Sequence, residues 1–287
     1  MNKKSLDLSG KIDKHFVGIC QAFSKAADHL DIPFFLVGAT ALDLIFHKGY
    51  GIPAKRATYD IDLAVEVKNW TDFEALKNYL VSTDDFVQAP QAHRLNFQFS
   101  VDVDIVPFGA IADERGNIAW PPDQADVMST IGFSDACEDA ISVLLTKEPH
   151  LEIAVASPAA ITVLKIVAWK GRGHDNRKDA IDLSNILGDY IRAGNNERLF
   201  SDHDDLLHTE AFDYDLSGPR ILGRDIGKFF KPETKKFIQN ILVEETQENN
   251  HSRNQLIIDM SDRYEQGAFS RNLTMLRTLL LGIEDTV

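Results

Sequence analysis

Residues 58–67, with the sequence TYDIDLAVEV, restrict the fold of this chain more than any other stretch. Apolar side chains recur at every second position, as in a strand with one buried face: Ile61, Leu63, Val65 and Val67. Asp60 and Asp62 fall on the opposite face, roughly 6.5–7 Å apart at a rise of ~3.3 Å per residue. Two carboxylates held there repel each other unless a cation lies between them, and hard oxygen ligands select Mg²⁺ or Mn²⁺. By itself the pair is a weak signal, because surface strands also carry acids.

A second strand with acids on one face is expected at residues 101–107, VDVDIVP. Asp102 and Asp104 alternate there with apolar residues. Two strands of one small sheet, each with acids on one face, can build a single site of three or four carboxylates. Such a site can hold two metal ions about 3.5–4 Å apart, the arrangement used for in-line phosphoryl transfer. Asp102 is also explained as a solvated acid at the strand edge.

The segment before these strands offers donors for phosphate. An apolar strand at residues 34–37 ends at Gly38, and residues 39–46 are expected to form a helix that begins there. The N-terminus of a helix has unpaired N–H groups that bind phosphate, and glycine permits a close approach. Ala39 and Thr40 are small, and Thr40 adds a hydroxyl donor.

Hydrophobic periodicity divides the chain into a mixed first part and a helical second part. Up to residue 156 it predicts helices at 11–30, 39–46, 69–81 and near 135–145, and strands at 34–37, 58–67, 94–99 and 101–107. Ser157 and Pro158 then begin a helix, and further helices are predicted at 178–193, 222–247 and 253–282. We therefore expect an α+β (α/β) domain with a small mixed sheet over residues 1–156, followed by an α-helical domain over residues 157–287.

The composition favours a folded protein and restricts its location. Apolar residues make up 44% of the chain, which supports a core and argues against disorder. No apolar run reaches the ~18 residues that a membrane helix needs, and the N-terminus lacks the apolar stretch of a secretory signal. Cys20 and Cys137 show no CxxC spacing, which fits a reducing cytoplasm. We expect a cytoplasmic protein that does not contact a membrane.

The net charge of −14 counts against a protein that coats nucleic acid non-specifically. Two basic islands, residues 47–56 and residues 165–178, run against this trend. Each island is explained either as a surface for phosphate or as solvated loop charge. Arg172 and Arg177 in the second island are candidate contacts for phosphate or RNA.

The order of these segments resembles the nucleotidyltransferase superfamily that contains DNA polymerase β. Six stretches are similar to the AbiEii/AbiGii family of bacterial nucleotidyltransferases, which includes toxins of type IV toxin–antitoxin systems: FLVGATALDLIF, RATYDIDLAV, HRLNF, VDVDIVPFG, SPAAITVLKIVAWKGR and KDAIDL. The resemblance runs from about residue 33 to residue 190. It implies a polymerase β-like domain that uses Mg²⁺ (or Mn²⁺) and moves a nucleotidyl group from an NTP to an acceptor hydroxyl.

The resemblance also implies roles for residues near the two acidic strands. Asp60 and Asp62 match the metal-binding pair of the family. Asp104 matches the third carboxylate, which in the wider superfamily acts as a base on the attacking hydroxyl. Arg56 and Thr58 match an R-x-T-x-D-x-D pattern, and Arg56 could reach a phosphate as a bidentate donor.

The turn at Gly38 matches the turn that holds the nucleotide triphosphate in the family. Ala39 and Thr40 complete it. The superfamily more often has Gly-Ser at this turn, so Ala39 removes one hydroxyl contact that Thr40 would have to replace.

Lys165 lies in an otherwise apolar helix, where a lysine is costly unless its amine finds a partner. It matches the helix lysine of the family, and Asp179 and Asp182 match a K-D-x-x-D-L element. The amine points at the triphosphate in one interpretation and reaches solvent in the other. The two acids are one helical turn apart, so they orient Lys165 or a base, or they pair with Arg177 and Lys178. We expect Lys165→Ala to weaken NTP binding or reaction without destabilising the protein.

Three functions remain open from the sequence. The first is a toxin-like enzyme that adds nucleotides to an RNA 3′ end, in particular a tRNA, with a helix-turn-helix antitoxin encoded nearby. The second is a small-molecule nucleotidyltransferase of the antibiotic-modifying kind, which the negative charge favours. The third is a nucleotide-binding module without turnover, and the aspartates at every expected metal position count against it.

Overall fold

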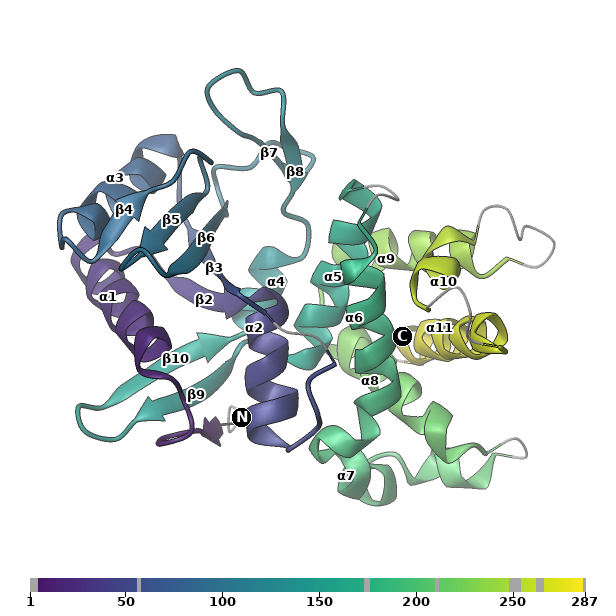
Figure 1. Cartoon of the computed structure of the whole chain (residues 1–287). Coiled ribbons are helices and arrows are strands. Elements are labelled where there is room, and N and C mark those ends of the chain that lie inside the picture. Colours follow the sequence, from purple (N-terminus) through teal and green to yellow (C-terminus); the bar gives the residue numbers. More distant parts are fainter. Residues whose placement is uncertain are drawn as a thin grey trace. The chain divides into compact units, whose positions relative to one another are not determined.

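The structure is a computed structural model of the whole chain. It describes residues 5–55, 58–172, 176–209, 212–247, 254–261 and 266–285. The chain separates into two compact units, Met1–Ser157 and Pro158–Val287, and each unit is described by itself (Figure 1). Arg56, one of the expected site residues, lies outside the described residues.

The first unit is built on a mixed eight-stranded sheet with the order β1-β9-β10-β2-β3-β6-β5-β4. Its strands are β1 (Ser5–Asp7), β2 (Phe34–Val37), β3 (Asp60–Glu66), β4 (Phe86–Gln88), β5 (Arg94–Phe97), β6 (Val101–Phe108), β9 (Ile141–Thr146) and β10 (Leu151–Val155). A separate two-stranded sheet pairs β7 (Asn117–Ala119) with β8 (Val127–Ser129).

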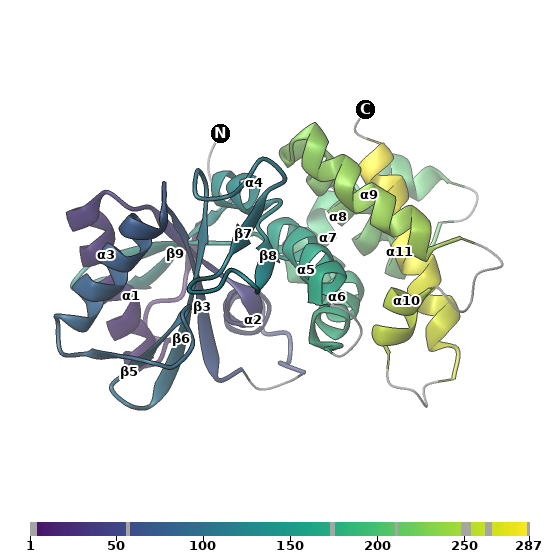
Figure 2. The ribbon, with the colours of Figure 1, turned by 90° about the horizontal axis from the view of Figure 1, so that it is seen from above.

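Helices lie on both faces of the large sheet. They are α1 (Lys14–Leu30), α2 (Gly38–Leu42), which continues as a π-helical segment (Asp43–Gly49), α3 (Trp70–Val81) and α4 (Phe133–Glu138). Figures 1 and 2 show α1 and α3 together on one side of β3 and β6, and α2 on the other side. Helix α1 is capped by Asp13, whose side chain accepts from the N–H groups of His15 and Phe16. Its buried positions recur every three or four residues, as an amphipathic helix requires.

The pairing of the central strands decides where the acidic residues lie. Strand β3 is antiparallel to β2 and parallel to β6. In this register Asp60 is opposite Asp102 and Asp62 is opposite Asp104. Ile61 and Leu63 are buried in the core. The acids of both strands therefore share the other face.

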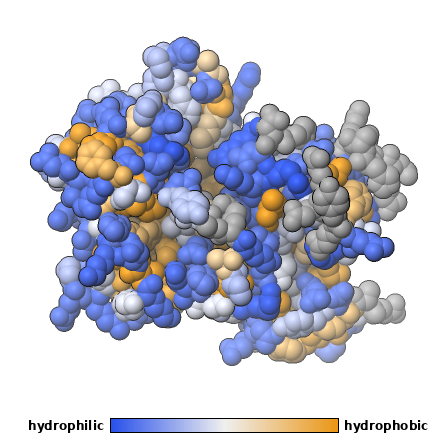
Figure 3. Space-filling model, viewed as in Figure 1, coloured by the Kyte–Doolittle hydropathy of each residue, from blue (hydrophilic) through white to orange (hydrophobic). Residues whose placement is uncertain are grey.

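The second unit is helical. Its elements are α5 (Pro158–Arg172), α6 (Lys178–Asp189), a π-helical turn (Ile191–Asn195), α7 (Asn196–Ser201), a 3₁₀ turn (Asp204–His208), α8 (Tyr214–Phe229), α9 (Pro232–Glu245), α10 (Gln255–Asp259) and α11 (Ala268–Glu284). Helices α8 and α11 cross where Gly223 and Gly282 let the two backbones touch. None of the helices in the described residues has the length and apolar character to cross a lipid bilayer. The face drawn in Figure 3 is mostly hydrophilic, with smaller apolar patches.

The expected fold class, an α/β unit with a mixed sheet followed by helices, is confirmed. The helix expected near 135–145 is wrong in its second half, because α4 ends at Glu138 and Ile141–Thr146 form strand β9. In this strand Val143 and Leu145 are buried while their neighbours are partly exposed, which is the two-residue period of a strand. Its pairing with β1 and β10 stabilises the strand over a short local helix.

Candidate metal and nucleotide site

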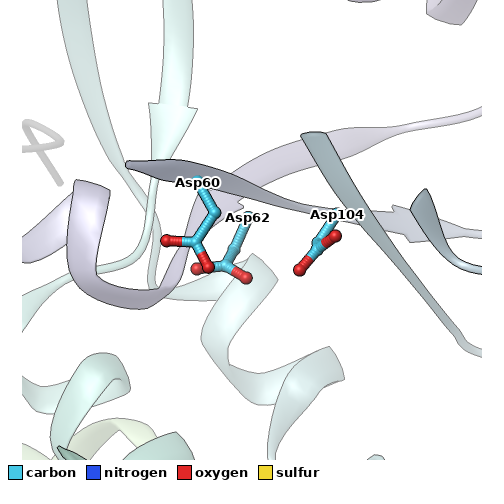
Figure 4. A group of neighbouring side chains, drawn as sticks. All are labelled: Asp60, Asp62 and Asp104. Atoms are coloured by element: carbon cyan, nitrogen blue, oxygen red, sulfur yellow. The ribbon is translucent and has the colours of Figure 1, made fainter. Parts of the chain in front are cut away.

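Three carboxylates converge on one side of the central sheet. Asp60 and Asp62 project from β3 and Asp104 projects from β6, all toward the same side (Figure 4). Each residue offers one carboxylate oxygen, and these three oxygens all lie within 4.8 Å of one another. All three residues are partly buried. Three carboxylate oxygens are the hard donor set that Mg²⁺ and Mn²⁺ prefer. The residues present at this site thus fit a divalent cation.

The turn at Gly38 is packed directly against this cluster. Gly38 has φ of +70°, and a Cβ atom built on it would lie 2.1 Å from Oδ2 of Asp62. A side chain at this position would meet both the backbone strain of the left-handed region and a steric clash. The Thr40 hydroxyl donates to the backbone carbonyl of Asp60 at 2.8 Å. The turn expected to hold phosphate therefore also supports the start of β3.

Arg94 is a member of the site that the sequence reasoning missed. It lies in β5 opposite Asp104. Its Nε and Nη2 atoms donate to the two oxygens of Asp104 at 2.6 and 2.8 Å, and Nη1 donates to Oδ2 of Asp102 at 2.8 Å. Asn96 donates to the other oxygen of Asp102 at 3.0 Å. In the stretch RLNF, just before the acidic strand, Arg94 and Asn96 fall on one face. A hairpin between this stretch and the acidic strand places these two side chains opposite the acids, and that pattern was the available sequence signal.

The neighbouring acids stabilise the positively charged form of Arg94. The hydrogen bonds to Asp104 raise the pKa of Arg94 well above its usual value; partial burial opposes this shift, and the charges of Asp104, Asp102 and Asp60 add to it. The guanidinium is thus fully protonated at any working pH. Asp102, whose role the sequence left open, contacts Arg94 rather than joining the group of three converging carboxylates.

Lys165 is buried in the second unit between two acids. Its Nζ lies 2.8 Å from Oδ1 of Asp179 and 2.8 Å from Oδ2 of Asp182, and its side chain is 10% exposed. Burial lowers the pKa of Lys165, but the two carboxylates outweigh burial and the net shift is upward. The interpretation in which the amine reaches solvent is wrong, because two carboxylates on α6 hold it inside. The interpretation in which Asp179 and Asp182 orient Lys165 agrees with these contacts.

Three other cations of the second basic island have partners within the same unit. Arg172 contacts Asp179 at 2.9 Å, and Lys170 contacts Glu244 at 3.0 Å. Arg177 lies 3.7 Å from Asp259 and donates to the backbone carbonyl groups of Ile258 and Ser261.

The expected site residues thus form two groups. The cluster of three acids, Gly38, Ala39, Thr40 and Thr58 belong to the first unit, and Lys165, Asp179 and Asp182 belong to the second.

Comparison with known families identifies the class. The family model described as "Nucleotidyl transferase AbiEii toxin, Type IV TA system" matches residues 22–256, which is most of the chain. The protein is accordingly a nucleotidyltransferase. The chain belongs to the AbiEii nucleotidyl transferase toxin family. A search of curated proteins gave no match.

Several solved structures are similar at low identity. The solution structure of the antibiotic-resistance factor ANT(2″)-Ia is 16% identical, with 69% of this chain and 100% of that chain covered and a TM-score of 0.34. The Thermotoga maritima CCA-adding enzyme complexed with tRNA is 13% identical, with 92% and 67% covered and a TM-score of 0.30. A CCA-adding enzyme with CTP is 14% identical, with 92% and 67% covered and a TM-score of 0.33. Similarity at this level is distant in both sequence and structure.

Proposed function

We propose that this protein is a Mg²⁺-dependent enzyme that transfers a nucleotidyl group from an NTP to the 3′ hydroxyl of an RNA, in particular a tRNA. The observation that carries the proposal is the convergence of Asp60, Asp62 and Asp104 from two parallel strands in register. In this proposal residues 1–156 are the nucleotidyltransferase domain, and residues 157–287 bind acceptor and nucleotide.

Each part of the proposed site has a physical role. Asp60, Asp62 and Asp104 would hold Mg²⁺ or Mn²⁺, which neutralises phosphate charge and stabilises the attacking and leaving oxygens. Asp104 would also accept the proton of the attacking hydroxyl. The remaining residues, which we propose contact or orient the triphosphate, are Gly38, Ala39, Thr40, Arg56, Thr58, Lys165 and Asp182. Positioning and electrostatics then account for most of the rate enhancement.

The acceptor and the partner are proposed from the family. A toxin of a type IV toxin–antitoxin system is expected to have an antitoxin, and we propose a helix-turn-helix protein encoded nearby. A small-molecule acceptor is the second candidate. It is favoured by the net charge of −14 and by the ion pairs that already engage Lys170, Arg172 and Arg177.

The test of the proposal is an incubation with Mg²⁺, each of the four labelled NTPs and bulk tRNA, followed by a search for lengthened 3′ ends. Asp60→Asn and Asp62→Asn should abolish labelling, because each removes one charge and one ligand oxygen from the cluster. Both variants should unfold at or above the temperature of the unmodified protein, because each relieves repulsion between acids. Asp84→Asn is the matched control, since Asp84 is exposed and outside the cluster.

The outcomes separate the candidates. Labelled RNA that disappears in both variants and persists in Asp84→Asn supports the proposal. Transfer to a small hydroxylated acceptor with no labelled RNA supports the second candidate. Undiminished Mg²⁺-dependent transfer in Asp60→Asn or Asp62→Asn contradicts the site itself.

A further inference from the structure

Arg94 has no assigned part in the proposed transfer, yet it donates three hydrogen bonds to the acids of β6. Its guanidinium forms a two-bond fork with Asp104, from Nε to Oδ1 at 2.6 Å and from Nη2 to Oδ2 at 2.8 Å. A fork of this kind fixes the plane of a carboxylate, which a single hydrogen bond does not. Each carboxylate oxygen keeps a second lone pair that can face a cation or a proton.

Arg94 is itself held in place. Its third donor, Nη1, is accepted by Asp102, and Asn96 donates to the other oxygen of the same carboxylate. The side chain of Arg94 is 24% exposed and that of Asp104 is 14% exposed, so water competes little for the fork, whereas Asp102 is 42% exposed. His93 adds a neighbouring ring nitrogen 3.8 Å from Oδ1 of Asp104.

The charges around the site explain why Arg94 is paired with Asp102 as well as with Asp104. The three converging aspartates have a formal charge of −3, and Arg94 with Asp102 adds a formally neutral pair. Arg94 alone would reduce the attraction of the cluster for a cation. With Asp102 beside it, Arg94 can orient Asp104 at little electrostatic cost to cation binding.

We propose that Arg94 is the positioning residue for Asp104 and that Asp102 anchors Arg94. The fork holds one Asp104 oxygen toward Asp60 and Asp62 before any cation or nucleotide arrives. This inference rests on the proposed function, because the orientation of Asp104 matters only if that carboxylate binds the cation or accepts the proton.

Binding of Mn²⁺, followed by the EPR signal of the free ion, tests the inference without any acceptor. Asp104→Asn should raise the Kd of Mn²⁺ about tenfold in the unmodified protein, the scale of effects around metal sites. In the Arg94→Gln background the same change should raise the Kd less than about threefold, because the carboxylate it removes is no longer oriented. Arg115→Gln, which removes an exposed cation from a turn of the same unit, should preserve the full effect of Asp104→Asn.

Two further variants separate geometry from charge. Arg94→Lys keeps the positive charge and loses the fork, so it should also reduce the effect of Asp104→Asn. It also keeps the test valid if Arg94→Gln fails to fold. Asp102→Asn removes the anchor and should produce the same change more weakly. In the transfer assay Arg94→Lys should lower kcat by about 10–100-fold, and its own Kd for Mn²⁺ should rise by about three- to tenfold, because an unoriented Asp104 contributes less to binding.

The results distinguish this inference from the function on which it rests. If the unmodified protein binds no Mn²⁺, the proposed site and the inference both fail. If Asp62→Asn abolishes Mn²⁺ binding while the effect of Asp104→Asn is equal in the unmodified, Arg94→Gln and Arg94→Lys backgrounds, the inference alone is overturned.

Discussion

At the scale of single residues, the close packing of Gly38 against Asp62 limits which residue the turn can hold. Gly38 lies under Asp62, and a Cβ atom on Gly38 would lie only 2.1 Å from the carboxylate oxygen, which leaves no room for a side chain. The glycine therefore has two functions in the fold. It adopts a left-handed backbone, and it lets an acidic strand pass directly over the strand–helix turn.

Gly38→Ala should abolish transfer and Mn²⁺ binding, because the added methyl group displaces Asp62. Gly51→Ala is the matched control: Gly51 also has φ of +70°, and within the described residues no neighbouring atom lies within 4 Å of its Cβ position. Gly51→Ala should lose about 1–2 kcal/mol of stability from the left-handed backbone. Gly38→Ala should lose more, because its methyl group also clashes with Asp62, and only Gly38→Ala should lose the metal. Mn²⁺ titration together with thermal unfolding checks this. Normal Mn²⁺ affinity in Gly38→Ala would show that the turn adjusts.

At the scale of elements, α5 and α6 are joined by an ion pair that removes Lys165 from water. Two acids on α6 bind one amine on α5. Breaking a buried pair leaves buried charge with less compensation, which is strongly destabilising. Of the two acids, Asp179 keeps its contact with Arg172. The sequence predicted that loss of Lys165 would leave stability unchanged, and these contacts reverse that expectation.

Lys165→Met should therefore lower the free energy of unfolding by about 3–5 kcal/mol, in addition to any effect on NTP binding. Lys170→Met on the same helix is the control, because its pair with Glu244 is 42% and 54% exposed and should contribute only about 0–1 kcal/mol. Chemical denaturation of both variants measures the difference. Equal stabilities would mean that Asp179 and Asp182 relax toward water when the amine is removed.

The crossing of α8 and α11 gives a second prediction at this scale. A Cβ on Gly223 would lie 2.2 Å from the backbone carbonyl of Leu279 and 2.8 Å from the Cα of Gly282, so Gly223→Ala should cost about 1–3 kcal/mol or more. Gly188→Ala in α6 should instead be neutral or gain up to about 1 kcal/mol, since the part of the chain that is described leaves open space at that Cβ position. Thermal unfolding of the two variants checks the opposite signs.

At the scale of the whole molecule, the net charge affects how strongly the protein binds a polyanion such as RNA. The net charge is −14, and Lys170, Arg172 and Arg177 already contact acids. An RNA acceptor has to approach against the overall field and with few unengaged cations in that basic island. Recognition would then depend on contacts at the RNA terminus more than on many phosphate contacts.

RNA binding should accordingly depend weakly on salt. We expect the Kd for tRNA, measured with constant Mg²⁺ by filter binding, to rise less than about tenfold between 50 and 200 mM monovalent salt. A protein that neutralises 6–10 phosphates would lose about 10³–10⁵ in affinity over the same range. A loss on that larger scale would show that a basic surface binds the RNA backbone.

The sequence was sufficient to find the acids and insufficient to find what holds them. Asp60, Asp62, Asp102 and Asp104 could be assigned to one face of two strands because a two-residue period identifies the face of a strand. The choice of Asp104 over Asp102 came from the family resemblance. Arg94 was missed because its role depends on β5 pairing with β6 in one register, and pairing joins residues that no local period connects. The strand at Ile141–Thr146 was missed because its short apolar pattern also fits the end of a helix, and its pairing with β1 and β10 decides between the two.

By itself the sequence determined the division into an α/β part and a helical part and the acids on one face of two strands, because these follow from local periodicity and from residue chemistry. Only the tertiary structure decided three contacts. Asp62 packs against Gly38, Arg94 donates to the carboxylate of Asp104, and Lys165 lies between two aspartates. The physical reason is the same in each case. These contacts join different strands and helices, and their geometry is set by strand register and helix packing rather than by local sequence.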